Sequence, residues 1–417
     1  MNASVLPPLK DRDSLLAHAA KLPLEQIDLS NWNLNEFDAV WPYFERLRKE
    51  DPVHYLADSR YGPFWSITKY DDIKAVDQNH KVFSSQGTIG IEDLPDDFQT
   101  PMFIAQDQPI HDVQRRAVSP VVGPRNLAGF ESIIRERVCT ILDNLPVGET
   151  FNWVDRVSIE LTTQMLATLF DFPFEERHKL TRWSDVATVP DTTFEERKQE
   201  LLECLAYFTR LWHERKDAEP GFDLISMLAH GKDTRDMINN PLEYLGNILL
   251  LIVGGNDTTR NSITGGVLAL NQYPAEYEKL RADHSLIPNM VAEIIRWQTP
   301  LAYMRRTALQ DIELGGKQIK AGDKVVMWYA SGNRDEDKFE NADQLIIDRA
   351  NARNHISFGF GIHRCMGNRL AEMQLRVLWE EIMQRFEKVE VVGDVSRVRS
   401  NFVRGYTNLP VKVHPRT

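Results

Sequence analysis

Apolar side chains recur at spacings of three and four residues along most of the chain, a pattern that predicts amphipathic helices. Residues 37–49 and 129–145 show it, and residues 193–216 predict a longer helix, started by a threonine with a pair of glutamates behind it. Residues 240–274 predict one helix of about thirty residues. Residues 367–386 predict another that is apolar on more than one face and therefore well buried. The chain is thus predicted to be mainly helical.

Alternation of apolar and polar residues, which is typical of strands, is confined to two regions. Residues 52–69 predict a hairpin near the N-terminus, and residues 311–330 alternate around Gly-Gly and Ala-Gly-Asp turns. No internal repeat, low-complexity tract or Ser/Gly-rich linker stands out in the sequence. We therefore expect a mainly α fold with a small β portion, built as a single domain over residues 1–417.

The chain is acidic, because 61 Asp and Glu residues against 49 Lys and Arg residues give a net charge of −12. Such a chain does not attract a phosphate backbone, so no nucleic-acid partner is expected. Its three cysteines form no CxxC pair, which argues against disulfides and for a reducing compartment. The N-terminus carries charges throughout, and the longest apolar run, residues 248–253, is far too short to span a bilayer. We expect a cytoplasmic protein without a signal peptide or membrane anchor.

One of the three cysteines lies in a glycine-rich stretch just before the helix predicted near the C-terminus. Phe358, Gly361, Cys365 and Gly367 form the pattern F-x-x-G-x-x-x-C-x-G. The positive end of the helix and its free N–H groups favour a thiolate at Cys365. Gly361 permits a positive φ and a close approach of the backbone to a flat ligand. A lone cysteine is more often a buried structural residue, so it is the whole spacing that indicates a ligand.

This spacing resembles the haem-binding loop of the cytochrome P-450 family. The resemblance implies that the Cys365 thiolate is the axial ligand of a haem b iron, with Phe358, Gly361 and Gly367 beside the porphyrin. It also implies the P-450 fold, in which the haem lies between a long distal helix and the proximal helix that follows the cysteine loop. The haem module would use the whole chain, so no fused reductase domain is expected.

The resemblance extends to charged residues that are far apart in the sequence. Glu293 and Arg296 stand in the family's Glu-x-x-Arg position, and Arg349 lies in a segment that resembles the one supplying a third member. An i, i+3 charge pair alone is common on solvated helix faces. We interpret the three residues as a buried ionic cluster that holds the cysteine loop, and as structural rather than catalytic.

A haem carries two propionates, which require cations in the pocket. His111 and Arg115 are one helical turn apart, as in the family's propionate-binding helix, although a surface helix can show the same spacing. The resemblance adds His363 and Arg306, with the neighbouring Arg305 as a rival of Arg306. Arginine suits a carboxylate because it can bind both oxygens.

The long predicted helix has a polar interruption in its middle. Gly254 and Gly255 each cost about 1 kcal/mol in a helix relative to alanine, and a crowded helix crossing would account for them. The segment also resembles the family's oxygen-activation motif. On that resemblance the glycines leave space for dioxygen, Thr258 holds the bound oxygen or a water, and Asp257 feeds protons toward it. Thr259 is an alternative hydroxyl donor.

The substrate pocket is assigned by position in the family, although any one of these residues could instead belong to the core. The expected lining residues are Ile248, Leu251, Ile252, Gly254, Leu301, Met304, Phe402 and Val403. No obvious anchor for a charged substrate stands out, although Arg404 could be one. At closer range the sequence resembles the soluble bacterial subfamily that hydroxylates medium-chain alkanes and fatty acids at the terminal carbon. Terminal attack requires a narrow channel, because geometry must override the strength of a primary C–H bond.

Electrons are expected to arrive from another protein. Residues 349–376 hold five arginines and one acid, a local excess of positive charge in an acidic chain. Our hypothesis is that Arg364 and Arg369, with Arg116, help form a docking patch for a small acidic ferredoxin, itself reduced by an NAD(P)H-dependent ferredoxin reductase. Ordinary surface scatter is the alternative explanation.

Four other interpretations stay open at this point. The first is oxidation of another hydrophobic substrate, such as a terpene, on the same site. The second is a peroxygenase that uses hydrogen peroxide, and the third is a haem-based sensor without turnover; the acid–alcohol pair Asp257 and Thr258 argues against both. The fourth is a zinc site at Cys365, whose surrounding histidines have no closed tetrahedral spacing.

Overall fold

The computed structural model describes residues 11–93, 98–188 and 193–416. Its helices are α1 (Arg12–Ala19), α2 (Asn33–Glu36), α3 (Trp41–Glu50), α4 (Tyr70–Gln78), α5 (Ile110–Val118), α6 (Pro124–Asp143), α7 (Glu160–Phe170), α8 (His178–Thr188), α9 (Phe194–Lys216), α10 (Leu224–His230), α11 (Pro241–Gln272), α12 (Pro274–Ala282), α13 (Ile287–Gln298), α14 (Tyr329–Gly332) and α15 (Asn368–Arg385). The prediction of a mainly α chain is confirmed.

The strands form a five-stranded sheet and smaller sheets. Their bounds are β1 (Val53–Leu56), β2 (Phe64–Ile67), β3 (Phe83–Ser84), β4 (Phe151–Asn152), β5 (Met304–Ala308), β6 (Ile312–Leu314), β7 (Lys317–Ile319), β8 (Lys324–Met327), β9 (Phe386–Val391), β10 (Ser396–Arg397), β11 (Tyr406–Asn408) and β12 (Pro410–Pro415). The large sheet has the order β1-β2-β8-β5-β3, and its β2–β8 pair is parallel. The β2–β8 pair brings together segments about 260 residues apart, which local alternation cannot predict.

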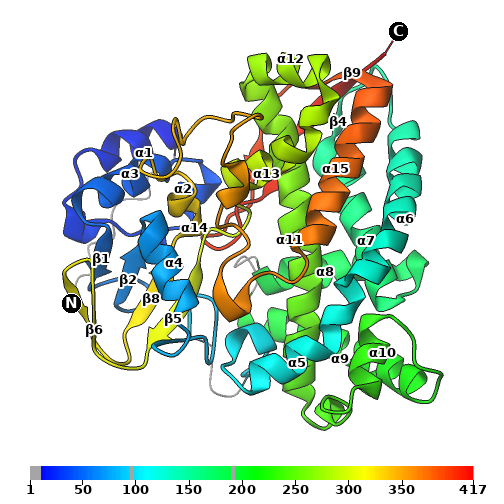
Figure 1. Ribbon diagram of the computed structural model, residues 1–417, viewed down its shortest axis with the longest axis horizontal. Coiled ribbons are helices and arrows are strands. Elements are labelled where there is room, and N and C mark those ends of the chain that lie inside the picture. The colour runs from blue at the N-terminus through cyan, green and yellow to red at the C-terminus, as the bar shows by residue number, and fades with distance from the viewer. Residues whose placement is uncertain (1–10, 94–97, 189–192, 417) are drawn as a thin grey trace.

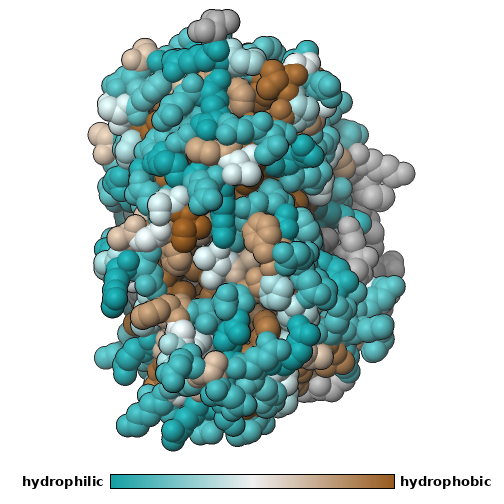
Figure 2. Space-filling model, turned by 90° about the vertical axis from the view of Figure 1, so that its right-hand side faces the viewer, coloured by the Kyte–Doolittle hydropathy of each residue, from teal (hydrophilic) through white to brown (hydrophobic). Residues whose placement is uncertain are grey.

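The strands β1, β2, β5 and β8 lie with α1 and α3 on one side of the molecule, and the longer helices form the other side, where β4 and β9 also lie (Figure 1). Within the helical part α11 contacts α7, α8, α9, α13 and α15, and the main hydrophobic core lies among these helices. The face on the side of α6 is mostly hydrophilic, with apolar residues in small scattered groups (Figure 2). None of the helices in the described ranges combines the length and hydrophobicity needed to cross a bilayer.

The predicted elements are present, some with shifted ends. The hairpin over 52–69 is the antiparallel pair β1–β2, and the alternation over 311–330 contains the β6–β7 hairpin and β8. Thr193 caps α9 by accepting a hydrogen bond from the Glu196 N–H at 3.3 Å. The helix predicted from residue 37 begins only at Trp41, because Asp38 has a left-handed backbone with a φ of 51°.

Candidate active site

A tight loop before α15 carries Cys365. The Cys365 N–H donates to the Phe358 carbonyl at 2.8 Å, and Gly361 has a φ of 67°. A Cβ at Gly361 would lie 2.8 Å from the carbonyl oxygen of Asp77, at the end of α4. The expectation that Gly361 serves a flat ligand is therefore wrong: it serves the close approach of the loop to α4, and it does not line the cavity beside the cysteine.

The Cys365 side chain faces that cavity, so its surface is exposed although protein surrounds it. Burial raises the pKa of the thiol above its usual value, whereas hydrogen bonds from the backbone of Gly367 and Asn368 and the charge of Arg115 lower it. The predicted support for a thiolate at the helix start is present, but burial outweighs it in the protein alone. A metal cation would reverse this balance, because a coordinating thiol is deprotonated.

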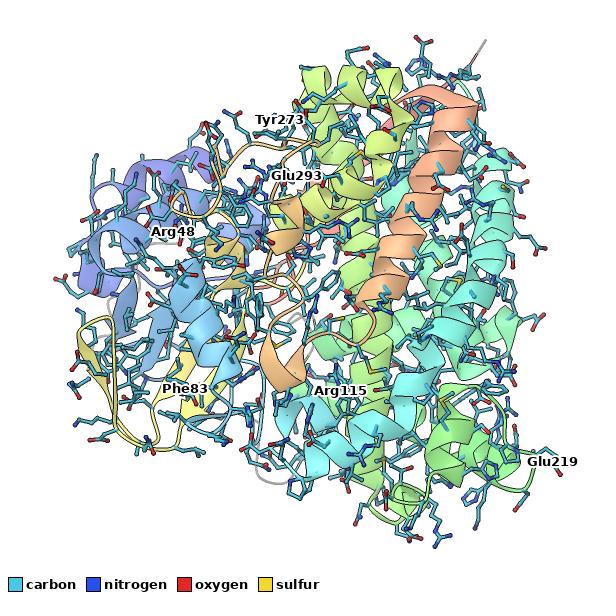
Figure 3. All side chains as sticks on the ribbon, viewed as in Figure 1. Arg48, Phe83, Arg115, Glu219, Tyr273 and Glu293 are labelled. Atoms are coloured by element: carbon cyan, nitrogen blue, oxygen red, sulfur yellow. The ribbon has the colours of Figure 1, made fainter. Side chains whose placement is uncertain are left out.

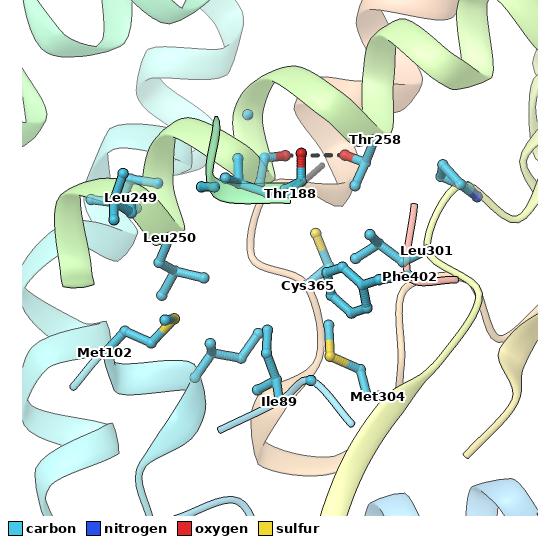
Figure 4. A pocket seen from close by; sticks show the side chains of 18 of the residues that line it. Ile89, Met102, Thr188, Leu249, Leu250, Thr258, Leu301, Met304, Cys365 and Phe402 are labelled. Atoms are coloured by element: carbon cyan, nitrogen blue, oxygen red, sulfur yellow. Dashed lines mark hydrogen bonds between the residues drawn. The ribbon is translucent and has the colours of Figure 1, made fainter. Parts of the chain in front are cut away.

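The cavity has a volume of about 700 Å³ and lies between the cysteine loop and α11. In Figure 4 the Cys365 sulfur points toward the α11 segment that carries Thr258. The apolar walls around it include Ile89, Met102, Leu249, Leu250, Leu301, Met304 and Phe402 (Figure 4). A thiol thus faces an enclosed and largely aliphatic space.

The two glycines of α11 do different things. A Cβ at Gly254 would meet no atom within 4 Å, so this position leaves open space in the cavity wall. A Cβ at Gly255 would lie 2.9 Å from Leu166 Cδ1, so this glycine lets α7 approach α11. The packing explanation therefore holds for Gly255, whereas Gly254 is open, and its use by dioxygen stays a prediction.

Asp257 and Thr258 point to different surroundings. Thr258 lines the cavity, and its hydroxyl donates to the Gly254 carbonyl at 3.0 Å. Asp257 is fully buried outside the cavity, where it accepts hydrogen bonds from Ser184 at 3.0 Å and Thr188 at 3.1 Å and pairs with Arg260 at 3.1 Å. Burial raises the pKa of the Asp257 carboxyl, with Arg260 acting in the opposite direction.

Thr188 connects the buried acid to the cavity. It ends α8, lines the cavity, and donates to Asp257. Arg260 pairs at 2.6 Å with Asp185, a half-exposed residue of the same helix. Sequence reasoning missed α8, because Thr188 and Asp185 carry no motif and meet α11 only in three dimensions. Thr259, the predicted substitute donor, is buried and also borders the cavity.

Cations and imidazoles gather at the cysteine-loop end of the cavity. The cavity is lined here by Arg115 on α5 (Figure 3), Arg306 on β5 and His363. The ring of His111 lies 4.2 Å from that of His363. Neither ring nitrogen of His363, nor Nε2 of His111, has a hydrogen-bond partner in the described ranges. Burial, followed by the charge of Arg306, lowers the pKa of His363 to about 2. These donors fit an anionic group such as a porphyrin propionate.

Arg305 and Arg306 point to different partners. Arg306 is buried, pairs with Asp77 at 2.8 Å and lines the cavity. Arg305 pairs with Asp93 at 2.6 Å and does not line it. The geometry favours Arg306 over its rival Arg305 as a ligand of the propionate.

Five of the residues predicted to line the substrate pocket border the cavity. Leu251, Gly254, Leu301, Met304 and Phe402 line the cavity. The prediction for Ile248, Ile252 and Val403 is wrong: all three are buried among core residues, and the two isoleucines lie on a face of α11 that is turned away from the cavity.

Arg404 is not an anchor for substrate. It is buried outside the cavity, donates to the Gln298 carbonyl and lies over the ring of Trp41 at 4.3 Å. Its role is to join the C-terminal segment to the end of α13.

Glu293, Arg296 and Arg349 form the predicted ionic cluster. Arg296 Nε and Nη2 donate to the Glu293 carboxylate at 2.8 Å, and Arg349 Nε lies 3.0 Å from one of its oxygens. All three are buried, and Figure 3 labels Glu293 on α13. The arginines also donate to backbone carbonyls between residues 333 and 344, which precede the cysteine loop. In the described ranges no three His, Cys, Asp or Glu side chains gather as ligands of one metal ion, which disfavours the zinc alternative.

Comparisons with known proteins agree with this geometry. A family model described as Cytochrome P450 matches residues 150–401. The chain is 34% identical to linalool 8-monooxygenase from Pseudomonas putida, covering 94% of this chain and 100% of that protein. It is also 34% identical to a methyl-branched lipid omega-hydroxylase from Mycobacterium tuberculosis, covering 94% and 95% of the two chains.

Solved structures are similar over nearly the whole chain. Cytochrome P450-153 from Novosphingobium aromaticivorans is 47% identical with a TM-score of 0.87, covering 93% of this chain and 99% of the other. CYP153D17 from Sphingomonas sp. PAMC 26605 is 49% identical with a TM-score of 0.88, covering 93% and 98%. With the cysteine loop, the ionic cluster and the interrupted long helix all in place, the chain belongs to the cytochrome P450 family.

Proposed function

We propose that the protein is a haem-thiolate monooxygenase that hydroxylates medium-chain alkanes or fatty acids at the terminal carbon. The observation that carries the proposal is the aliphatic cavity that borders both the Cys365 thiol and the open position at Gly254. Such walls bind an alkyl chain through burial of apolar surface and offer few hydrogen bonds to a polar one.

The names of the relatives support this substrate class. One is called a methyl-branched lipid omega-hydroxylase and another a steroid C26-monooxygenase, names that describe oxidation of large hydrophobic molecules. The name linalool 8-monooxygenase favours the second candidate, oxidation of a terpene or similar compound.

Membership of the family implies a haem with a cysteine thiolate as axial iron ligand, and we propose haem b at Cys365. When bound, this group supplies the activation of dioxygen and the oxidation of a C–H bond. Arg115, Arg306 and His363 would hold its propionates, with His111 supporting His363. The residues present fit the group, because Arg115, Arg306 and His363 line one end of the cavity and neither ring nitrogen of His363 has a partner in the described ranges.

The chain's own part in the chemistry is to hold substrate and deliver protons. Two protons are consumed for each O–O bond that is cleaved, and a buried carboxyl with a raised pKa is a suitable donor. We propose that Asp257 passes them through the Thr188 hydroxyl to the cavity, where Thr258 orients a water or the reacting oxygen. Arg260 holds Asp257 in place and links it to Asp185 near the surface.

We further propose that electrons come from a small acidic ferredoxin reduced by an NAD(P)H-dependent reductase. Arg116, Arg364 and Arg369 are exposed, and none has an ion-pair partner in the described ranges. Two other arginines of the region serve the structure: Arg349 joins the ionic cluster and Arg376 pairs with Glu131 at 2.8 Å. If the rate at which the ferredoxin reduces the protein falls steeply with added salt, the docking patch is supported. If that rate does not depend on salt, the docking patch is refuted.

The decisive experiment combines a spectrum with a product analysis. Carbon monoxide added to the reduced holoprotein should give the red-shifted Soret band of a thiolate ligand, and the variant Cys365→His should lose it. Incubation with octane, octanoic acid, linalool and camphor should give terminal alcohols from the first two. A band that survives Cys365→His refutes the ligand assignment, and turnover of linalool or camphor alone replaces the alkane proposal by the terpene one.

A further inference from the structure

Arg197 places a positive charge on the wall of a mostly apolar cavity. It lies in the first turn of α9 and lines the same cavity as Cys365. Its Nε is buried without a hydrogen-bond partner, and no carboxylate of the described ranges lies within ion-pair distance of its guanidinium. A half-buried cation without a partner is unfavourable unless something else supplies an anion.

Three acids close to Arg197 in the sequence are engaged elsewhere. Glu196 accepts from the Thr193 N–H at 3.0 Å as part of the helix cap. Glu200 and Glu203 both pair with Arg182, at 3.1 and 2.6 Å. The acidic side of α9 is therefore turned toward α8, which leaves Arg197 facing the cavity.

The surroundings of Arg197 suit an amphiphile. Phe98, Phe194 and Leu201 line the cavity with it, and the rings of Phe98 and Phe194 are in edge contact at 6.1 Å. The ammonium of Lys198 lies over the same two rings, 5.5 and 5.8 Å from their centroids. A cation inside an apolar collar matches a carboxylate head group followed by an alkyl chain.

Arg197 also differs from the cations that fit the propionates. Those residues come from α5, β5 and the cysteine loop, whereas Arg197 comes from α9. Two separate groups of cations therefore border the cavity, one that fits the cofactor carboxylates and one, at α9, that lies apart from it.

We infer that Arg197 binds the carboxylate of a fatty-acid substrate and so fixes which carbon lies beside the cysteine loop. This rests on the proposed function in one respect, that the cavity holds the substrate. The planar guanidinium can grip both carboxylate oxygens, and the alkyl chain extends from it along the aliphatic walls. An anchored head group leaves the far end of a chain of suitable length at the reacting position, which favours terminal hydroxylation.

The test is equilibrium binding to the purified holoprotein, measured by dialysis with radiolabelled dodecanoate, methyl dodecanoate and dodecylamine. The variants are Arg197→Gln, Arg197→Glu and the control Arg210→Gln, which removes an exposed charge farther along α9 that pairs with Glu214. We expect Arg197→Gln to weaken dodecanoate binding about tenfold to hundredfold and to leave the methyl ester within twofold. We expect Arg197→Glu to prefer the amine, and Arg210→Gln to behave as wild type.

The outcomes separate the anchor from the proposed function. The anchor is overturned if Arg197→Gln weakens the binding of dodecanoate and of its methyl ester equally, or weakens neither. It is also overturned if the wild-type protein binds the acid and the ester with equal affinity. Hydroxylation of octane with no carboxylate preference overturns the anchor and leaves the proposed function intact. Selective dodecanoate binding that depends on Arg197, without hydroxylated product, supports the anchor and refutes the proposed function.

Discussion

Replacing Glu293 by glutamine should remove the charge that holds two buried arginines. The Glu293 carboxylate accepts from Arg296 twice at 2.8 Å, from Arg349 at 3.0 and 3.1 Å, and from the Ile346 N–H at 2.9 Å. A glutamine side chain keeps the shape but has one acceptor oxygen, and its NH₂ group would face donors. The variant therefore leaves two guanidinium groups uncompensated in the interior.

The magnitude follows from burial. Glu293 and Arg296 are both fully buried and Arg349 nearly so, and removing one partner of a buried pair costs about 3–5 kcal/mol. Against a typical stability of about 5–15 kcal/mol, this is a large fraction. Because the arginines also bind the backbone that leads into the cysteine loop, we expect the haem content to fall as well.

The measurement is urea unfolding followed by tryptophan fluorescence, with haem content determined from the absorption spectrum. The matched control is Glu50→Gln, the same chemical change in an exposed i, i+4 pair with Arg46, for which we expect at most about 0.5 kcal/mol. If Glu293→Gln lowers the free energy of unfolding no more than Glu50→Gln does, the cluster is not a structural support and the argument fails.

Three further outcomes test other parts of the structure. Gly254→Ala should raise the free energy of unfolding in urea by up to about 1 kcal/mol, because the added Cβ meets no neighbour. The same variant should turn over bulky substrates more slowly. A lower free energy of unfolding would mean that the cavity wall is closed at this position. Asp257→Asn should slow turnover about a hundredfold at unchanged haem content and raise the solvent isotope effect, and undiminished product formation would remove it from proton delivery. Burial, followed by the charge of Arg296, lowers the pKa of His355 to about 3. Below about pH 6.5 the unfolded chain therefore binds a proton that the folded protein does not, and stability falls, by about 2 kcal/mol at pH 5 from this residue. His355→Gln should lose less stability than wild type between pH 7 and pH 5, and equal losses would contradict this.

Local chemistry made part of this structure predictable. The Thr193 cap, the β1–β2 hairpin and the thirty-two residues of α11 each depend on neighbours in the sequence, so pattern and propensity suffice. The ionic cluster was predictable for another reason: its members match a family spacing, although Arg349 lies 56 residues from Glu293.

The cavity lining could not be predicted from the sequence, because it depends on which face of each helix or strand meets which neighbour. The first half of α11 is apolar on every side, so hydropathy cannot tell Leu251, which lines the cavity, from Ile248 and Ile252, which do not. A cavity-lining stripe at Leu251, Gly254 and Thr258 emerges only once the helix is placed. Arg197 was missed because an arginine among glutamates in a predicted amphipathic helix is typical of a solvated face.

Helix geometry also separates the acid from the alcohol of the interrupted helix. Successive residues of a helix point about 100° apart, so Asp257 and Thr258 face different neighbours. The Thr258 hydroxyl bonds to its own helix at Gly254, whereas the Asp257 carboxylate bonds to Ser184 and Thr188 of α8. Of those two residues, Thr188 also lines the cavity. On the proposed relay, a proton that leaves Asp257 for the cavity passes through the Thr188 side chain at the end of α8, so the packing of α8 against α11 positions the relay.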